Sequence, residues 1–129
     1  RRTETSVMKL LLGIGGSDDS IRALERTVAR VAETGDDLTV AILRNPATEA
    51  DPEGIERRVQ DVLDDAGVRA AVRHLDGDPG SRLVELAEGE EYDRIVLGGG
   101  ETSPMGKIKL GSIAEFVLLN SHVSVTLVR

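Results

Sequence analysis

The feature that most restricts the fold is an alternation of short apolar runs with longer amphipathic segments along the whole chain. Almost continuous apolar runs of five to eight residues are typical of strands buried on both faces of a sheet. Strands that alternate with helices form right-handed crossovers and a parallel sheet covered by helices on both sides. The sequence therefore predicts an α/β, Rossmann-like fold with one doubly wound sheet of five strands, at residues 7–14, 38–43, 68–75, 94–98 and 123–128.

The four helices have recognisable ends. Aspartate followed by proline, at residues 51–52 and 78–79, is typical of a helix start and opens the second and third helices. Glycine after the first two amphipathic segments, at Gly35 and Gly67, predicts where those helices end. We expect the last helix to begin with Ser112 as its N-cap.

Composition excludes several classes of protein. Among its 129 residues the chain has no Cys, which excludes disulfides, thiolate nucleophiles and Cys-ligated zinc. One Tyr, one Phe, no Trp and a net charge of −7 argue against binding to nucleic acid. No apolar run approaches a membrane span and no signal-peptide pattern opens the chain. We expect a cytoplasmic protein with one domain at residues 7–129 and a frayed segment at residues 1–6.

The basic residues are mostly arginine, with thirteen Arg against three Lys. Many acidic residues with few lysines are typical of halophilic proteins, and a GC-rich genome produces the same bias. Both explanations concern solubility and not activity.

The last third of the chain predicts an anion site. The strand at residues 94–98 opens into three glycines, and a loop leads from Gly98 to Gly111 and Ser112, where a helix begins. Glycine allows a ligand to approach the backbone, and a helix N-terminus presents unpaired N–H groups that favour phosphate. The glycine-rich turn at residues 13–17 follows the first strand. Both turns should meet where the strand order reverses, which is the usual ligand site in such sheets.

The pattern resembles the universal stress protein family. The likeness rests on residues 10–24, 77–87 and 92–98 and on the loop to Gly111 and Ser112, and it covers residues 7–129. The resemblance implies a strand order 3-2-1-4-5, dimers formed through the fifth strand, and ATP, with Mg, as a ligand in many members.

Two positions depart from the motif of the ATP-binding members, which reads Gly, two residues, Gly, nine residues, then Gly-Ser or Gly-Thr. Gly98 and Gly111 match it, but Glu101 stands where the second glycine is expected. The Asp that such members place in the first turn is Gly15 here. A carboxylate beside a triphosphate opposes binding through charge repulsion.

The nucleotide-binding set that the resemblance and the loop imply has twelve members. These are Gly13, Gly15, Leu43, Leu97, Gly98, Gly100, Ser103, Gly106, Lys107, Gly111, Ser112 and Ile113. Gly100, Ser103, Gly106 and Lys107 would form an alternative phosphate cradle around the Glu101 position, and Lys107 alternatively is a solvated loop charge.

No catalytic residues or metal ligands can be assembled. Asp18 and Asp19 lack the companion residues of a phosphoacceptor or two-metal site and are expected at a helix start. His74 and His122 lie far apart in the sequence without convergent acids. We expect the acidic residues 85–91 to be solvated.

Three functional classes remain open. The first is a stress-response binding or signalling domain with an adenine-nucleotide site. The second is a nucleotide-free dimeric interaction module. The third is a slow ATPase or an adenylating enzyme, because residues 15–20 faintly resemble a pyrophosphate loop whose leading Ser is Ile14 here.

The last strand predicts a homodimer. Val123, Val125 and Leu127 belong to a β-branched, uncharged strand that the order 3-2-1-4-5 places at an edge of the sheet. Such an edge is a template for pairing, and we expect two copies to pair antiparallel about a two-fold axis.

Overall fold

In a computed structural model the protein is described for residues 7–15, 18–43, 51–98, 101–102, 108–109 and 111–128. At residues 18, 101, 102, 108 and 109 the description covers the backbone alone. The elements are β1 (Lys9–Ile14), α1 (Asp18–Thr34), β2 (Asp37–Leu43), α2 (Pro52–Ala66), β3 (Ala71–Leu75), α3 (Pro79–Gly89), β4 (Arg94–Gly98), β5 (Glu101–Thr102), β6 (Ile108–Lys109), α4 (Ser112–Asn120) and β7 (Ser124–Val128).

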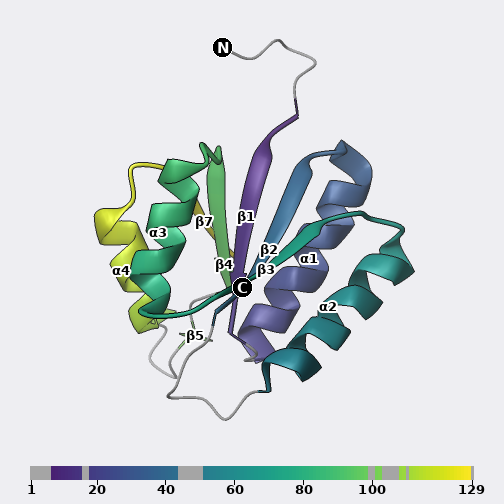
Figure 1. The fold of residues 1–129 in the computed structure, drawn as a ribbon, viewed down its shortest axis with the longest axis horizontal. Helices are drawn as coiled ribbons and strands as arrows, with labels where there is room; N and C mark the ends of the chain where they lie inside the picture. Colours follow the sequence, from purple (N-terminus) through teal and green to yellow (C-terminus); the bar gives the residue numbers. More distant parts are fainter. Residues whose placement is uncertain are drawn as a thin grey trace.

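The main sheet has five parallel strands in the order β3-β2-β1-β4-β7. This confirms the predicted α/β fold and the order 3-2-1-4-5, with β7 as the fifth strand. Helices α1 and α2 lie on one side of the sheet, and α3 and α4 lie on the other (Figure 1). Right-handed crossovers require this division, because the chain leaves β1 in one direction for β2 and β3 and then returns past it to β4 and β7.

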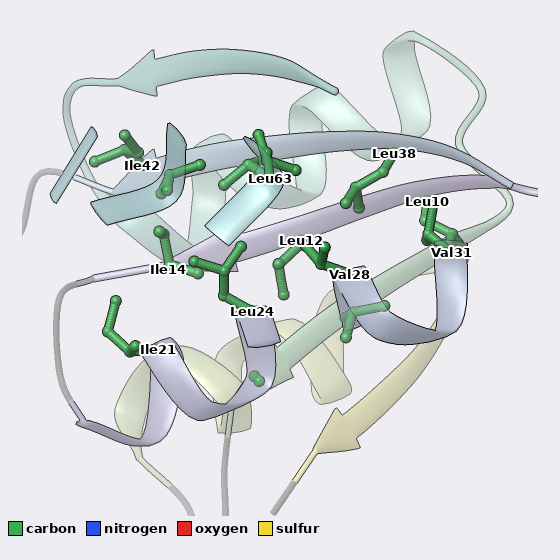
Figure 2. Packing of buried hydrophobic residues seen from close by; sticks show 14 of the residues in the cluster. Leu10, Leu12, Ile14, Ile21, Leu24, Val28, Val31, Leu38, Ile42 and Leu63 are labelled. Atoms are coloured by element: carbon green, nitrogen blue, oxygen red, sulfur yellow. The ribbon is translucent and has the colours of Figure 1, made fainter. Parts of the chain in front are cut away.

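The sheet separates two apolar clusters. In the α1/α2 cluster, shown in Figure 2, Leu10, Leu12 and Ile14 of β1 pack against α1 and α2. In the α3/α4 cluster, Leu11 of the same strand packs with residues of α3 and α4 such as Leu83. Successive side chains of a strand point to opposite faces, so a continuous apolar run in β1 supplies both clusters. Burying each such leucine contributes roughly 1.5 to 3 kcal/mol.

The predicted helix ends are largely confirmed. The Asp51 carboxylate accepts hydrogen bonds from two backbone N–H groups at the start of α2, and the Asp78 carboxylate accepts one at the start of α3. Gly35 and Gly67 follow α1 and α2 with φ values of 76° and 66°, in the left-handed region that glycine adopts without strain. Strand β3 begins only at Ala71, three residues later than predicted. Its first pairing partner is Thr39, the third residue of β2.

Two expectations need correction. Ser112 is not an N-cap, because the chain enters α4 in an extended conformation at Gly111 and Ser112 is already the first helical residue. The segment between Gly98 and Gly111, expected to be a loop, contains regular structure, because β5 and β6 pair antiparallel within it. The segment expected to be frayed, residues 1–6, lies outside the described residues.

The remaining expectations on surface residues agree with the structure. The acidic residues of 85–91 are exposed, and β3 forms one edge of the sheet. Among the described helices, none combines the length and the apolar character that a membrane crossing requires.

Candidate functional site

The strand order reverses between β1 and β4, and the parallel strands all end at one edge of the sheet. Gly13 of β1 pairs with Leu97 of β4. Gly15 and Gly98, which come just after these two residues, therefore lie near each other at the carboxyl ends of the strands. The starts of α1, α2 and α4 lie at the same edge, toward the bottom of Figure 1. The described starts of the two turns, Gly15 and Gly98, thus leave neighbouring strands on the same side of the molecule.

Gly98 is in contact with the first turn of α1. A Cβ atom added at Gly98 would lie 2.5 Å from the carbonyl oxygen of Asp19 and 3.0 Å from the Cα of Ser20. These are backbone atoms and cannot rotate away. The end of β4 therefore requires glycine for packing, independently of any ligand.

The start of α4 is open. Gly111 is its N-cap, with φ −71° and ψ 160°, and no side chain caps the helix. Gly111 and Ser112 are exposed, and an added Cβ at Gly111 would meet nothing within 4 Å. The first N–H groups of the helix consequently keep their capacity to bind an anion.

The neighbouring helix starts differ in this respect. Carboxylates already occupy the N-termini of α2 and α3, since Asp51 accepts hydrogen bonds from Glu53 and Gly54 and Asp78 accepts one from Ser81. The hydroxyl of Ser81 and, second, its N–H hold the pKa of Asp78 below its usual value. An anion arriving at this edge would be repelled at those two helices, whereas α4 has no carboxylate at its N-cap and carries Glu115 later in its first turn.

The predicted nucleotide-binding residues divide into three groups. Gly15, Gly98, Gly111, Ser112 and Ile113 are exposed or half-buried at this edge. An added Cβ at Gly15 would likewise meet nothing within 4 Å.

The second group is buried. Leu43 and Leu97 are 4% and 3% exposed and pack in the α3/α4 cluster. Gly13 lies beneath Leu83 of α3, whose Cδ2 would be 2.9 Å from an added Cβ. Packing alone therefore explains why this position is glycine.

The third group, formed by Gly100, Ser103, Gly106 and Lys107, lies outside the described residues. Next to them, Glu101 at the anomalous motif position belongs to β5, and its backbone is directly opposite Lys109 of β6. The anomalous residue is thus part of a hairpin and not of an open loop.

The candidate acids and histidines do not form a site. Asp18 begins α1 as expected, and the Asp19 carboxylate lies 3.2 Å from Arg22, one turn along the helix. His74 Nε2 contacts the Glu56 carboxylate on the surface, and the backbone N–H of His122 donates to Glu88. In the part of the chain that the structure describes, no three acidic or histidine side chains gather as metal ligands.

Sequence reasoning missed residues that the fold adds to the same edge. Asp76 and Gly77 follow β3, and Gly77 has a φ of 99°. The glycine directly before the helix-opening Asp78 was an available signal, since the predicted end of this strand at Leu75 is the observed one.

Comparison with known proteins identifies relatives. The model of the universal stress protein family matches residues 7–129. Universal stress protein MJ0531 of Methanocaldococcus jannaschii is 34% identical over 73 residues, which cover 57% of this chain and 43% of that protein. Universal stress protein MJ0577 of the same organism is 27% identical over 123 residues, which cover 95% of this chain and 66% of that protein. The chain therefore spans less than two thirds of the length of either curated relative.

Solved structures give the same picture. A universal stress protein in complex with cAMP is 30% identical, with a TM-score of 0.74 over 96% of this chain and 98% of that one. A universal stress protein from Archaeoglobus fulgidus is 22% identical, with a TM-score of 0.73 over 96% of this chain and 100% of that one. The second similarity concerns the fold alone.

Proposed function

Because the chain belongs to the universal stress protein family, we propose that it is a stress-response domain that binds an adenine nucleotide where β1 and β4 end. In this proposal residues 7–129 form the one domain, and the phosphates lie at the start of α4.

The observation that carries the proposal is the open N-terminus of α4. Its N-cap, Gly111, provides no side chain, and Gly111 and Ser112 are exposed at the position of the family's Gly-Ser pair. A helix start of this kind attracts phosphate through its N–H groups and its partial positive charge. Residues 101–129 also carry a net charge of +1, whereas residues 1–100 carry −8.

The choice of an adenine nucleotide rests on the relatives. The similar structure at 30% identity holds cAMP, and its chain and this one overlap almost completely. The accessible residues Gly15, Gly98, Gly111, Ser112 and Ile113 would contact the ligand directly. The buried residues Gly13, Leu43 and Leu97 would form the wall behind it.

One observation favours a second candidate, a nucleotide-free interaction module. Glu101 occupies a glycine position of the motif, and its charge opposes a triphosphate. The two candidates differ in one measurable property, which is the affinity for nucleotide.

The test is calorimetry with ATP, ADP, AMP and cAMP, with and without Mg²⁺, on protein cleared of bound ligand. We expect micromolar binding of at least one of them. Gly111→Asp should weaken that binding at least tenfold, because it places a carboxylate at the phosphate position. It should not damage the fold, since Asp is a favourable N-cap and the site has room for a Cβ.

Gly111→Asn is the matched control, because it has the same shape and capping ability without the charge. Its affinity should fall less than that of Gly111→Asp, because the Asn side chain caps the same N–H groups but does not repel the phosphate. Equal weakening by both substitutions would locate the effect in side-chain volume and not in phosphate repulsion. No heat at millimolar concentrations of all four nucleotides would refute the proposal and leave the nucleotide-free module.

We further propose that the domain is a homodimer formed through β7. The two edges of the sheet differ: β3 carries polar and charged side chains with surface partners, since Arg73 is ion-paired with Glu90 and His74 contacts Glu56. No charged residue occurs in β7.

Helix α4 beside β7 adds exposed apolar surface. Phe116 is 36%, Leu118 42% and Leu119 77% exposed. Charged side chains blunt an edge strand, and their absence in β7 favours pairing with a second copy. Val123, Val125 and Leu127 would lie along that interface.

A further inference from the structure

The two faces of the sheet are unequally covered at β4 and β7. On one face α3 and α4 pack over Ile95, Leu97, Val125 and Leu127. On the other face α1 packs over Val96 of β4 and reaches β7 only at its margin, near Val128. The residues of β7 that point to this face, Thr126 and Val128, remain half-buried.

A groove of about 690 Å³ occupies this place. Its volume is in the range usual for small-molecule sites. Met8, Val96 and Val128 contribute apolar surface to it. It begins at the amino ends of the strands, because Met8 precedes β1 and Arg94 begins β4, and it extends to Val128, the last residue of β7. None of the residues that line it belongs to the predicted nucleotide-binding set.

Three guanidinium groups line the groove. Arg26 and Arg30 are one turn apart on α1, and Arg94 comes from the facing strand. Arg94 donates to the hydroxyl of Thr126 at 2.6 Å, which holds it at the groove. Neither Arg26 nor Arg30 forms an ion pair or hydrogen bond with another described residue, so both are available to a ligand.

The two acids of the lining offset only part of this charge. Asp36 accepts the backbone N–H of Met8 at 3.0 Å, and Glu33 lies one turn beyond Arg30 on α1 without an ion pair to any described residue. Three positive and two negative groups leave this groove positive on a chain whose net charge is −7. An apolar floor beside a positive wall suits a molecule with an apolar body and one anionic end.

We propose that the groove between α1 and the uncovered face of β4 and β7 binds a small amphipathic carboxylate, with the chemistry of a medium-chain fatty acid. The carboxylate lies against Arg26, Arg30 and Arg94. The hydrocarbon chain lies over Met8, Val96 and Val128. Arginine is suited to this role because its planar fork can bind both carboxylate oxygens at once.

The probe is decanoate, titrated by calorimetry into the full chain at physiological ionic strength and below its micellar concentration. We expect one site per chain, with an affinity at least tenfold higher than for decanol, which lacks the charge, or for acetate, which lacks the apolar body. Gly111→Asp should leave decanoate binding unchanged, because Gly111 is not in the groove.

Arg30→Glu should weaken decanoate binding at least tenfold. Arg58→Glu is its control, since Arg58 is also an exposed helix arginine but lies outside the groove. Ala29→Phe, which places a ring at the groove lining without changing a charge, should also weaken binding. All three positions are exposed on helices, so the variants should fold.

Three results would overturn the proposal. The first is the absence of decanoate binding at millimolar concentration. The second is equal weakening by Arg30→Glu and Arg58→Glu, which indicates a general charge effect. The third is that decanoate does not bind while Arg30→Glu changes self-association, measured by sedimentation. That result would identify the groove as a contact between two copies of the chain.

Discussion

Gly98 has no room for a side chain, because the carbonyl oxygen of Asp19 lies where a Cβ would be placed. We predict that Gly98→Ala destabilises the protein by about 1 to 3 kcal/mol, the usual cost of forcing atoms into a packed region. Chemical denaturation measures this as a change in the free energy of unfolding.

Gly89→Ala is the control, because an added Cβ at this last residue of α3 meets nothing within 4 Å. It should leave stability unchanged or raise it by up to about 1 kcal/mol. If Gly98→Ala is as harmless as Gly89→Ala, then the contact between β4 and α1 is looser than described and the glycine is required for another reason.

Glu91 has a φ of 56°, a left-handed conformation that costs a residue with a Cβ about 1 kcal/mol. Glu91→Gly should therefore raise the free energy of unfolding by up to about 0.6 kcal/mol, after the greater flexibility of glycine in the unfolded chain is deducted. Thermal and chemical denaturation both measure it. Glu91→Ala removes the carboxylate but keeps the Cβ, and it should leave stability near that of the wild type. A gain with Ala as large as with Gly would mean that charge, and not backbone strain, is the cause.

At the scale of elements, the start of α3 links stability to pH. Hydrogen bonds from Ser81 lower the pKa of Asp78 in the folded state, so the stabilisation is complete above the unfolded pKa and is lost as pH falls through the folded pKa. We predict that the wild type loses stability between about pH 5 and pH 2, and that Asp78→Asn loses less over this range. Denaturation curves at several pH values give both slopes. Parallel curves would show that the bonds from Ser81 do not favour the ionised form.

Helices and strands were predictable where a single residue type determines the backbone. Asp51 and Asp78 mark helix starts because their carboxylates accept backbone N–H groups, and Gly35 and Gly67 mark helix ends because glycine adopts positive φ. The hairpin β5–β6 was not predictable, since two-residue strands carry no periodic pattern. The N-cap of α4 was predicted one residue too late, at Ser112, because serine is favoured at N-caps, whereas the chain uses Gly111.

At the scale of the whole molecule, the unequal edges of the sheet predict the site of self-association. Ser124→Lys in β7 should raise the dimer dissociation constant at least tenfold, because a lysine blunts the edge and two-fold symmetry brings both copies of it to one interface. Sedimentation velocity over a range of concentrations measures this.

The matched control is Ala71→Lys, on the exposed edge strand β3. It should leave the dissociation constant unchanged. A monomeric wild type, or equal weakening by both lysines, would contradict pairing through β7.

The two candidate sites differ in how many of their residues could be predicted from the sequence. The open start of α4 depends on neighbouring residues, so a motif search finds Gly111 and Ser112. The groove depends on residues far apart in the chain, such as Arg30 and Arg94, which only the packing of α1 against β4 brings together. The burial of Leu43 and Leu97 likewise follows from how α3 and α4 cover the sheet.

The division of the interior by the sheet has a consequence for how this chain can vary. Leu24 belongs to the α1/α2 cluster and Leu83 to the α3/α4 cluster, and the hydrogen-bonded sheet separates the two. The effects on stability of changing the volume of these two side chains should therefore be additive. A change of side-chain volume in one cluster can be compensated by substitutions at other residues of the same cluster. The two clusters can therefore diverge in sequence largely independently, and only the central strands β1, β2 and β4, which supply residues to both, tie them together.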